Sequence, residues 1–337
     1  MVFFNIFFKT LGFFSALIVL LIIINLLVYL IPDSRKSDFV YKQGDKNSEN
    51  IIAVLNLNGP IINSANLLNK NIFNLIDPKY LKNSVNELLE LKPKILIIKI
   101  NSPGGTVSAT YEAAEIIKNY KSKSETIIYF VTENVLTSGA YWLANAGDKI
   151  YASYGSIIGS IGVSGPSWYY YDNPTSISSG LFGQTITTNN GIKIFNQNSG
   201  NSKDLFNSFR KPTKQELEHL QSMVDEIYDK FVNFVSKSRK IEKNYIKNEI
   251  GALVYTSIQA KQMYLIDGIL NYENLISEIV KINKYESFKI MEKTQQKKFF
   301  QEYFLNYFSN HYNHDEKICN KISSNFSTIF PNYFNTC

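Results

Sequence analysis

The sequence predicts an α/β protein, in which a mostly parallel sheet is covered by helices and preceded by one membrane-spanning helix. Four short apolar runs rich in β-branched residues have the length of buried strands: residues 51–57, 95–100, 126–131 and 149–152. Residues 79–91 and 106–121 lie between successive runs and have apolar side chains at helical spacing. Strands that alternate with helices are typical of parallel sheets.

The membrane-spanning helix is indicated by residues 11–31, which are 21 residues without a charged side chain. A helix needs ~20 apolar residues to cross the core of a bilayer. No cleavage site of small residues follows this run, and Pro32 ends it. The pattern therefore favours an uncleaved anchor over residues 1–32 rather than a removed signal peptide. We expect a single-pass protein of the cell membrane, with the lipid bilayer as a partner.

The rest of the chain divides into three parts by composition. Residues 33–50 are polar without periodicity and are expected to be a linker. The predicted globular domain takes residues 51–280 and includes a helix that begins with a capping box at Thr213. Residues 281–337 are first Lys-rich and then rich in Phe, Tyr and Asn. They form an extension whose structure the sequence does not predict.

The composition excludes several classes of function. With 45% hydrophobic and 19% charged residues among 337, the chain is globular rather than disordered. Its net charge of +6 is spread along the sequence without an aromatic-interleaved basic patch, so we expect no nucleic-acid partner. The two cysteines, Cys319 and Cys337, lack metal-ligand spacing, and the sequence has no G-x-x-x-x-G-K-[ST] phosphate loop. We therefore expect neither a metal nor a cofactor.

Glycine- and serine-rich turns follow the predicted strands and are candidates for catalytic backbone. Residues 101–105 form one such turn, and residues 155–163 form another. Between them, Ser138 and Gly139 open a helix of small residues, where a serine hydroxyl lies near unpaired backbone N–H groups. Leu136 occupies the first glycine position of a G-x-S-x-G elbow, which argues against an α/β-hydrolase.

The ordered set of motifs resembles the signal-peptide peptidase A or protease IV type of serine-lysine peptidases. The motifs that carry the resemblance are Asn101-Ser102-Pro103-Gly104-Gly105, Thr137-Ser138-Gly139-Ala140-Tyr141, Gly159-Ser160-Ile161-Gly162-Val163, Ser199-Gly200-x-x-Lys203-Asp204, Gln221-Ser222-Met223-Val224-Asp225 and Leu265-Ile266-Asp267-Gly268. A Ser-Pro-Gly-Gly turn by itself also occurs in Clp proteases, but the ordered set covers roughly residues 51–280. The resemblance implies a fold of the Clp protease and crotonase type, built of repeated β-β-α units.

The same resemblance implies that Ser138 is the nucleophile and Lys203 the general base, with the Ser160 hydroxyl orienting the lysine. A serine hydroxyl attacks a peptide carbonyl only when a base takes its proton. A lysine can be that base only when it is neutral, and because a free lysine titrates near ~10.4 this requires an apolar pocket. Residues 207–210, Asn-Ser-Phe-Arg, stand where family members commonly have a Ser-Pro pair, so the loop after Lys203 is expected to differ in shape.

The glycines would stabilise the tetrahedral intermediate, whose oxyanion needs preorganised N–H donors. By resemblance the donors are the backbone amides of Gly104 or Gly105 and of Gly139. The alternative is that residues 103–105 form only a tight turn between a strand and a helix.

The resemblance implies a membrane-anchored serine endopeptidase that cleaves signal peptides or other short apolar membrane-derived peptides. It also implies a homo-oligomeric ring in which each Ser–Lys pair forms between neighbouring subunits. The family places the catalytic domain outside the cytoplasm, and we expect that placement. The distribution of cationic residues around the anchor favours the opposite orientation. Lys9 lies before the anchor, whereas four cationic residues follow it: Arg35, Lys36, Lys42 and Lys46.

Two other functions stay open. One is a ring-forming membrane scaffold that kept the fold and lost catalysis, for which the altered loop after Lys203 is the best support. The other is a crotonase-type enzyme acting on an acyl thioester, whose oxyanion hole would use similar glycines. That second alternative gives no reason for the set of Ser138, Ser160 and Lys203.

Overall fold

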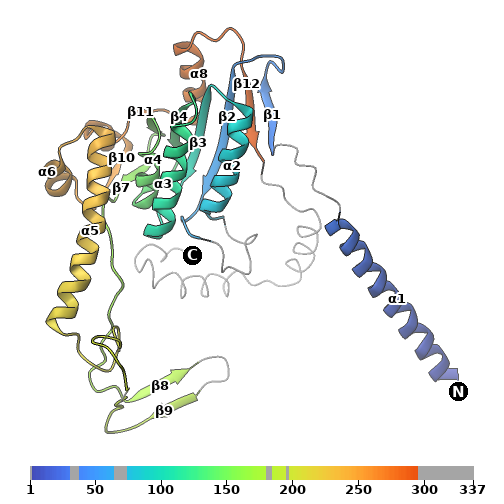
Figure 1. Cartoon of the computed structure of the whole chain (residues 1–337), viewed down its shortest axis with the longest axis vertical. Helices are drawn as coiled ribbons and strands as arrows, with labels where there is room; N and C mark the ends of the chain where they lie inside the picture. Colours follow the sequence, from blue (N-terminus) through green and yellow to red (C-terminus); the bar gives the residue numbers. More distant parts are fainter. Residues whose placement is uncertain (1, 31–37, 64–73, 180–183, 195–196, 295–337) are drawn as a thin grey trace. The chain divides into compact units, whose positions relative to one another are not determined.

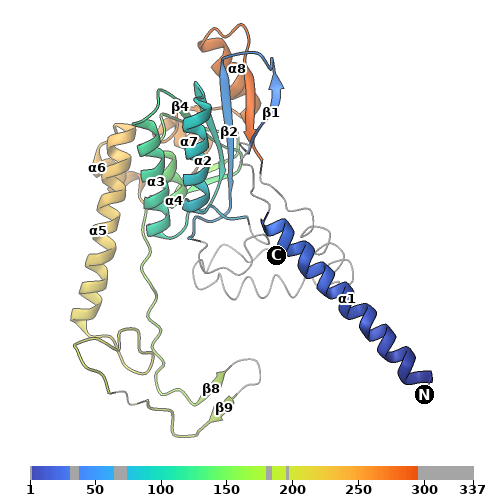
Figure 2. The same ribbon diagram turned by 45° about the vertical axis from the view of Figure 1, so that its right-hand side comes forward.

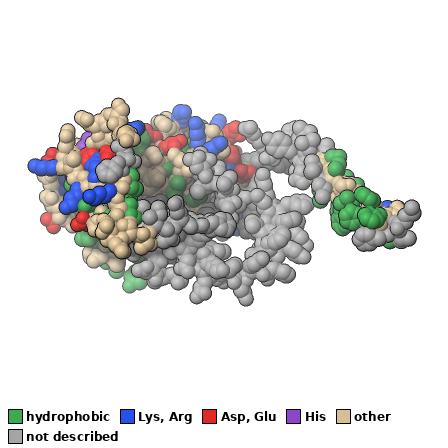
Figure 3. Space-filling model, turned by 90° about the horizontal axis from the view of Figure 1, so that it is seen from below, with side chains coloured by type: hydrophobic (Ala, Val, Ile, Leu, Met, Phe, Trp, Pro, Cys, Tyr) green, Lys and Arg blue, Asp and Glu red, His purple; other side chains and the backbone are tan. Residues whose placement is uncertain are grey.

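A computed structural model describes residues 2–30, 38–63, 74–179, 184–194 and 197–294. The chain forms two units, of which one is Phe39–Lys293 and the other contains both ends of the chain. In the terminal unit, helix α1 (Val2–Leu30) contains the apolar segment Phe4–Leu21, whose mean hydropathy is 1.9. None of this segment is buried. Figure 3 shows mainly hydrophobic side chains where α1 is drawn in colour. This helix is long and apolar enough to cross a membrane, as the sequence predicts.

The main sheet of the larger unit has seven strands in the order β1-β12-β2-β3-β4-β6-β11. Their bounds are β1 (Phe39–Gly44), β12 (Lys289–Lys293), β2 (Ile51–Asn58), β3 (Ile95–Asn101), β4 (Ile127–Thr132), β6 (Lys149–Ala152) and β11 (Gly268–Ile269). All pairings from β12 to β11 are parallel, and only the edge strand β1 runs antiparallel to its neighbour. The central strands are apolar along their length because helices cover both faces.

Helices α2 (Pro78–Leu91) and α3 (Val107–Lys121) cover one face of this sheet, and α8 (Tyr272–Ile282) covers the other (Figures 1 and 2). Leu81 and Ile117 join the larger core on the first face, whereas Leu275 and Ile279 pack on the second. Asp77 caps α2, since its side chain accepts a hydrogen bond from the Lys79 amide at 3.0 Å. These elements agree with the α/β class predicted from the sequence.

A β-β-α unit begins at strand β4, which pairs with the central strand β3 of the main sheet. Strand β4 continues into the short strand β5 (Val135–Thr137) and then into helix α4 (Gly139–Ala144). Strand β6 is likewise followed by β7 (Ile157–Gly159), and β5, β7 and β10 (Val254–Thr256) form a second sheet in the order β10-β7-β5. Helix α7 (Ser257–Gln262) follows β10. This is the repeated arrangement expected for the Clp protease and crotonase type of fold.

Helix α5 (Lys214–Arg239) begins with the capping box predicted at Thr213, which is complete in both directions with Glu216. Its carboxyl-terminal half packs on α4, where Trp142 stacks on Phe231 with ring centroids 4.7 Å apart. Figures 1 and 2 show that its amino-terminal half continues beyond α3 and α4. We call the described residues from 164 to 226 the arm.

Three further elements complete the larger unit. The arm contains the hairpin of β8 (Ser176–Ser179) and β9 (Gln184–Thr187). After α5, the chain forms the short helix α6 (Lys243–Tyr245) and the π-helical turn Ile246–Ile250.

The folded unit extends beyond residues 51–280 at both ends, which differs from the expected boundaries. Strand β1 lies inside the segment 33–50 that the sequence assigns to a linker, and β12 lies inside the extension 281–337. The two strands pair with each other, with Phe39 opposite Lys293, and β12 also pairs with β2. Both strands are short and carry lysines, so neither has a clear alternation of apolar and polar residues. Their strand conformation depends on the pairing with a segment distant in the sequence. Residues 295–337, with both cysteines, lie outside the described residues.

Candidate active site

Ser138 lies on a strained turn between β5 and α4. Its backbone has φ 54° and ψ −127°, a conformation that side-chain-bearing residues rarely adopt. Its amide donates to the Gly159 carbonyl at 2.9 Å, and its own carbonyl accepts from the Trp142 amide at 3.0 Å. The side chain is half-buried. Strain of this kind persists where the surroundings fix the backbone, and it is frequent at catalytic sites.

Gly104 packs directly against this turn. A Cβ atom at Gly104 would lie 3.1 Å from the Ser138 Oγ and 2.8 Å from the Gly139 amide nitrogen. With φ at +103°, the position also favours glycine on conformational grounds. Its own amide already donates to the Ser102 Oγ at 3.1 Å. Gly104 therefore provides the close approach of the two turns, while its N–H group is engaged elsewhere.

Gly105 and Gly139 are two further glycines packed around the Ser138 turn. The backbone of Ile61 runs against Gly105 and leaves no room for a side chain there. A Cβ at Gly139 would lie 3.3 Å from the Gly105 nitrogen and only 2.4 Å from the Thr110 Oγ1. Among the hydrogen bonds of the described residues, neither Gly105 nor Gly139 donates its amide. The geometry thus brings together two unengaged N–H groups at Ser138.

Ser160 lies close to the same turn through its neighbour in sequence. The Gly159 carbonyl accepts from Ser138, and the Ser160 amide donates to the Leu253 carbonyl at 2.7 Å. Ser160 has φ 53°, so it is a second strained serine next to the first. This loop is fixed by β7, which pairs with β5 on one side and β10 on the other.

Lys203 lies apart from this cluster within one chain. It is exposed, in a turn closed by hydrogen bonds from the Lys203 amide to Gly200 and from the Leu205 amide to Ser202. Among the described residues, no hydrogen bond or ion pair joins Lys203 to Ser138 or Ser160. The structure therefore brings five of the six expected site residues together and leaves the lysine outside.

The separation follows from the way the turn is attached to α5. Arg210 joins Asp204, the residue after Lys203, to Glu216 in the first turn of α5. The α4 helix that follows Ser138 instead contacts Phe231 near the other end of α5. At 1.5 Å per residue, these two contacts are roughly 22 Å apart along the helix axis. A single chain therefore does not form a Ser138–Lys203 hydrogen bond.

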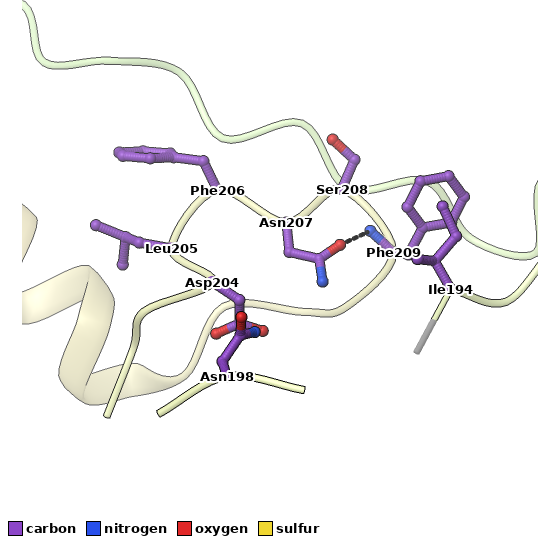
Figure 4. Close-up of a pocket in the computed structure, with 8 residues that line it drawn as sticks. All are labelled: Ile194, Asn198, Asp204, Leu205, Phe206, Asn207, Ser208 and Phe209. Carbon is purple, nitrogen blue, oxygen red and sulfur yellow. Dashed lines mark hydrogen bonds between the residues drawn. The ribbon is translucent and has the colours of Figure 1, made fainter. Parts of the chain in front are cut away.

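The Lys203 turn is followed by an apolar surface. Figure 4 shows Leu205, Phe206 and Phe209 on the same loop, with Ile194 beside Phe209. They line an open hollow of ≈ 490 Å³ together with polar residues of the arm. Trp168 braces this loop, because its Nε1 donates to the Asn207 carbonyl at 3.1 Å and its ring contacts Phe206.

Thr110 and Arg210 are two residues of this arrangement that the sequence did not single out. Thr110 is buried against Gly139, and its Oγ1 lacks a hydrogen-bond partner among the described residues. Arg210 makes the densest set of ion pairs in the arm. Neither has a local sequence signal, since Thr110 reads as an ordinary helix residue and Arg210 as one cation among many. Over the described ranges, no cluster of His, Cys, Asp or Glu is placed to hold a metal ion.

Comparison with known proteins shows similarity to one family of peptidases. The family model described as Peptidase family S49 matches residues 121–285. A putative signal peptide peptidase SppA of Enterococcus faecium is 29% identical over 259 residues, which cover 74% of this chain and 68% of that protein. Residues 121–285 thus match the S49 family, and the relatives found include a putative SppA peptidase. The resemblance of the motifs is thereby confirmed.

Two further similarities concern a second relative and a solved structure. A putative protease of Methanocaldococcus jannaschii is 30% identical over 217 residues, which cover 64% of this chain and 65% of that relative. The second is the solved structure of a mutant of a membrane-bound stomatin-specific protease. The match covers 68% of this chain and 85% of that chain, with 14% sequence identity and a TM-score of 0.40.

Proposed function

We propose that this chain is a membrane-anchored serine endopeptidase that uses Ser138 and Lys203 to cleave signal peptides or other short apolar peptides. The observation that carries the proposal is the strained Ser138 turn, with the unengaged amides of Gly105 and Gly139 beside it. Strain and close approach of this kind suit a nucleophile that must be exposed next to oxyanion donors. The match of residues 121–285 to the peptidase family model supports peptidase chemistry at this turn.

In the proposed reaction, the Ser138 Oγ attacks the peptide carbonyl carbon while the neutral Lys203 amine takes the hydroxyl proton. The carbonyl oxygen becomes the oxyanion and accepts hydrogen bonds from Gly105 and Gly139. The C–N bond then breaks, and the lysine gives its proton to the leaving amine. Water, deprotonated by the same lysine, hydrolyses the acyl-enzyme and frees Ser138. The Ser160 hydroxyl orients the amine through a hydrogen bond.

The dyad forms between two copies of the chain in this proposal, because one chain holds Ser138 and Lys203 apart. The exposed apolar side chains of the arm support such an assembly. Leu217 is 49% exposed and Met223 is 50% exposed on α5, and Tyr169 and Phe206 are exposed nearby. Burying them against a neighbour would remove apolar surface from water and surround the lysine with the low polarity that keeps an amine neutral.

The location proposed for the enzyme is the cell membrane, with α1 as the single-pass anchor and the catalytic unit outside the cytoplasm. The 29-residue apolar helix supports an anchor by its length. A protease tethered at the bilayer meets apolar peptides where they are released, which fits the proposed substrate class. A substituted-cysteine accessibility assay on residues flanking α1 tests the orientation directly.

The deciding experiment is peptide hydrolysis by the full chain in detergent, comparing wild type, Ser138→Ala and Lys203→Ala at matched oligomer content. Each substitution should lower kcat/KM by about 10³-fold or more, because the two groups act as a unit. Lys211→Ala, eight residues from Lys203 and also exposed, serves as the matched control and should cleave like wild type.

Co-expression of the two inactive variants separates a dyad between chains from one within a chain. A ring of both variants contains intact Ser138 facing intact Lys203 at about one quarter of its interfaces if copies mix at random. Recovery of activity near that level would support the assembly. An inactive mixture would contradict a dyad between chains, and a wild type without cleavage on a broad peptide panel would favour the scaffold.

A further inference from the structure

Arg210 binds two carboxylates at once, each through both of its oxygens. Its Nε and Nη2 donate to the Oδ2 and Oδ1 of Asp204, both at 2.7 Å. Its Nη1 and Nη2 donate to the Oε2 and Oε1 of Glu216 at 2.9 and 2.7 Å. Paired contacts of this kind use the planar fork of guanidinium, which a lysine does not offer. The result is a compact cluster of one cation and two anions, which we call the Arg210 clamp.

The Arg210 clamp fastens the Lys203 turn to α5. Glu216 also accepts from the Thr213 amide at 2.8 Å, so the same carboxylate caps the helix and holds Arg210. The side chain of Glu216 is 5% exposed, which is unusual for a carboxylate near a helix start. The Arg210 guanidinium lies 5.2 Å from the centre of the Trp168 ring, which completes the enclosure. The turn is thus joined through Asp204 to an arginine that also contacts Glu216 and Trp168.

The Arg210 clamp also keeps both carboxylates ionised and occupied. Hydrogen bonding to Arg210 holds the pKa of Asp204 below its ordinary value. The pKa of Glu216 is lowered first by Arg210 and then by the Thr213 amide. In turn, Asp204 and Glu216 raise the pKa of Arg210. Ser202, the residue before Lys203, also contributes to the lowering at Glu216, so this carboxylate lies beside the turn of the base.

This arrangement has a direct consequence for a lysine base, because a free carboxylate within ~4–6 Å stabilises the ammonium form. We propose that Arg210 is a positioning residue for Lys203, which fixes its turn and engages Asp204 and Glu216 so that neither carboxylate pairs with the Lys203 amine. The proposal rests on the proposed function, in which Lys203 acts as the base. It explains why an arginine with two acidic partners stands next to a residue that must lose its charge.

The other charged groups around the turn leave this assignment intact. Those of the arm are Asp172, Lys193, Lys211, Lys214, Glu218, His219, Asp225 and Glu226. Asp225 accepts from the Gln221 side chain, and Glu226 pairs with Lys230 farther along α5. Asp172 accepts from the Tyr170 hydroxyl, and Glu218 pairs with Lys214 one turn along α5. Asp204 and Glu216 are therefore the acidic groups whose release would place negative charge next to Lys203.

The test is a series of pH–rate profiles of peptide hydrolysis by the full chain from about pH 6 to pH 10.5. Arg210→Met keeps the length of the side chain and removes the guanidinium, and should move the midpoint of the rising limb upward by about 1 pH unit. Adding Asp204→Asn to that variant should return the midpoint towards wild type. Lys211→Met removes the neighbouring cation, which makes no ion pair among the described residues, and should leave the profile unchanged.

Other results would overturn the proposal. A rate that falls equally at every pH, without a shift that Asp204→Asn reverses, would make Arg210 a purely structural residue. An unchanged profile in Arg210→Met would exclude any role. If that variant does not fold, Arg210→Lys, which keeps the charge and loses the fork, decides with the same readout. A wild type that does not cleave, or an active Lys203→Ala, would instead reject the proposed function.

Discussion

The surroundings of Ser138 and those of Lys203 are built in opposite ways. Around Ser138, residues far apart in sequence fix the backbone: Gly104 lies against Ser138, and Thr110 against Gly139. Around Lys203 the fixing contacts are local, since Asp204, Arg210 and Glu216 lie within one short stretch. The Ser138 turn is therefore preorganised by the packed core, whereas Lys203 lies on a segment held together by ion pairs. Activity should respond differently to damage in the two regions.

The largest expected effect comes from the core side. Gly139→Ala should lower kcat/KM by about 10²–10³-fold, because its Cβ would meet the Thr110 Oγ1 and displace an oxyanion donor. Adding Thr110→Ala opens the space and should restore part of the rate. The measurement is peptide hydrolysis alongside thermal melting. A Gly139→Ala enzyme with the wild-type rate would show that this amide takes no part in catalysis.

A smaller effect should come from the half-buried ion pair of Arg239 with Asp267, which joins α5 to the core. The Asp267 carboxylate accepts from Arg239 at 2.7 Å and from the Ile150 amide at 2.9 Å. Burial raises the pKa of Asp267, but the hydrogen bond from Arg239 and these further contacts outweigh it, so the pKa lies below its ordinary value. A lowered carboxyl pKa stabilises the fold above the ordinary value near ~4 and loses that contribution as the pH falls through the folded value.

Asp267→Asn should therefore lower the free energy of unfolding by about 2 kcal/mol at neutral pH. The difference from wild type should shrink as the pH falls below about 4. Denaturant unfolding at several pH values measures it. Glu226→Gln, which removes an exposed pair with Lys230 in the same helix, is the matched control and should change little. A difference independent of pH would contradict the ionic origin.

The smallest effect should come from Leu217 and Met223, the exposed apolar side chains of α5 in the arm. Leu217→Glu with Met223→Glu should leave the unfolding free energy within about 0.5 kcal/mol, since both side chains are half exposed in one chain. The same change should weaken assembly and lower peptide hydrolysis about 10-fold, because a buried neighbouring surface would receive two charges. Light scattering and hydrolysis measure both quantities, with Glu218→Gln as control. If the variant still forms oligomers and is fully active, Leu217 and Met223 take no part in the contact between copies.

Together, these experiments locate the boundary between the packed and the modular halves of the site. If damage to the arm changes activity without changing the stability of the core, the two regions are coupled only through assembly. If damage to the arm also unfolds the core, α5 transmits the effect through the stack of Trp142 on Phe231. The comparison can therefore be refined by measuring stability and hydrolysis on every variant.

The sequence by itself determined the features that depend on neighbouring residues. Periodicity alone predicts the central strands β2, β3, β4 and β6 and the helices α2 and α3, because burial on one or both faces leaves a regular apolar pattern. The capping box at Thr213 is equally local. The position of Ser138 before a small-residue helix follows from the same kind of signal, and the ordered motifs lead to the family.

Only the tertiary structure decided the features that depend on distant partners. The edge strands β1 and β12 exist because they pair with each other, although each is too short and polar to be recognised alone. Gly139 must be glycine because Thr110 occupies the space of a side chain, and Gly105 because Ile61 does. The separation of Lys203 from Ser138 follows from the length of α5 between two attachment points. Local patterns encode burial and turns, whereas contacts between remote segments are fixed only when the chain packs.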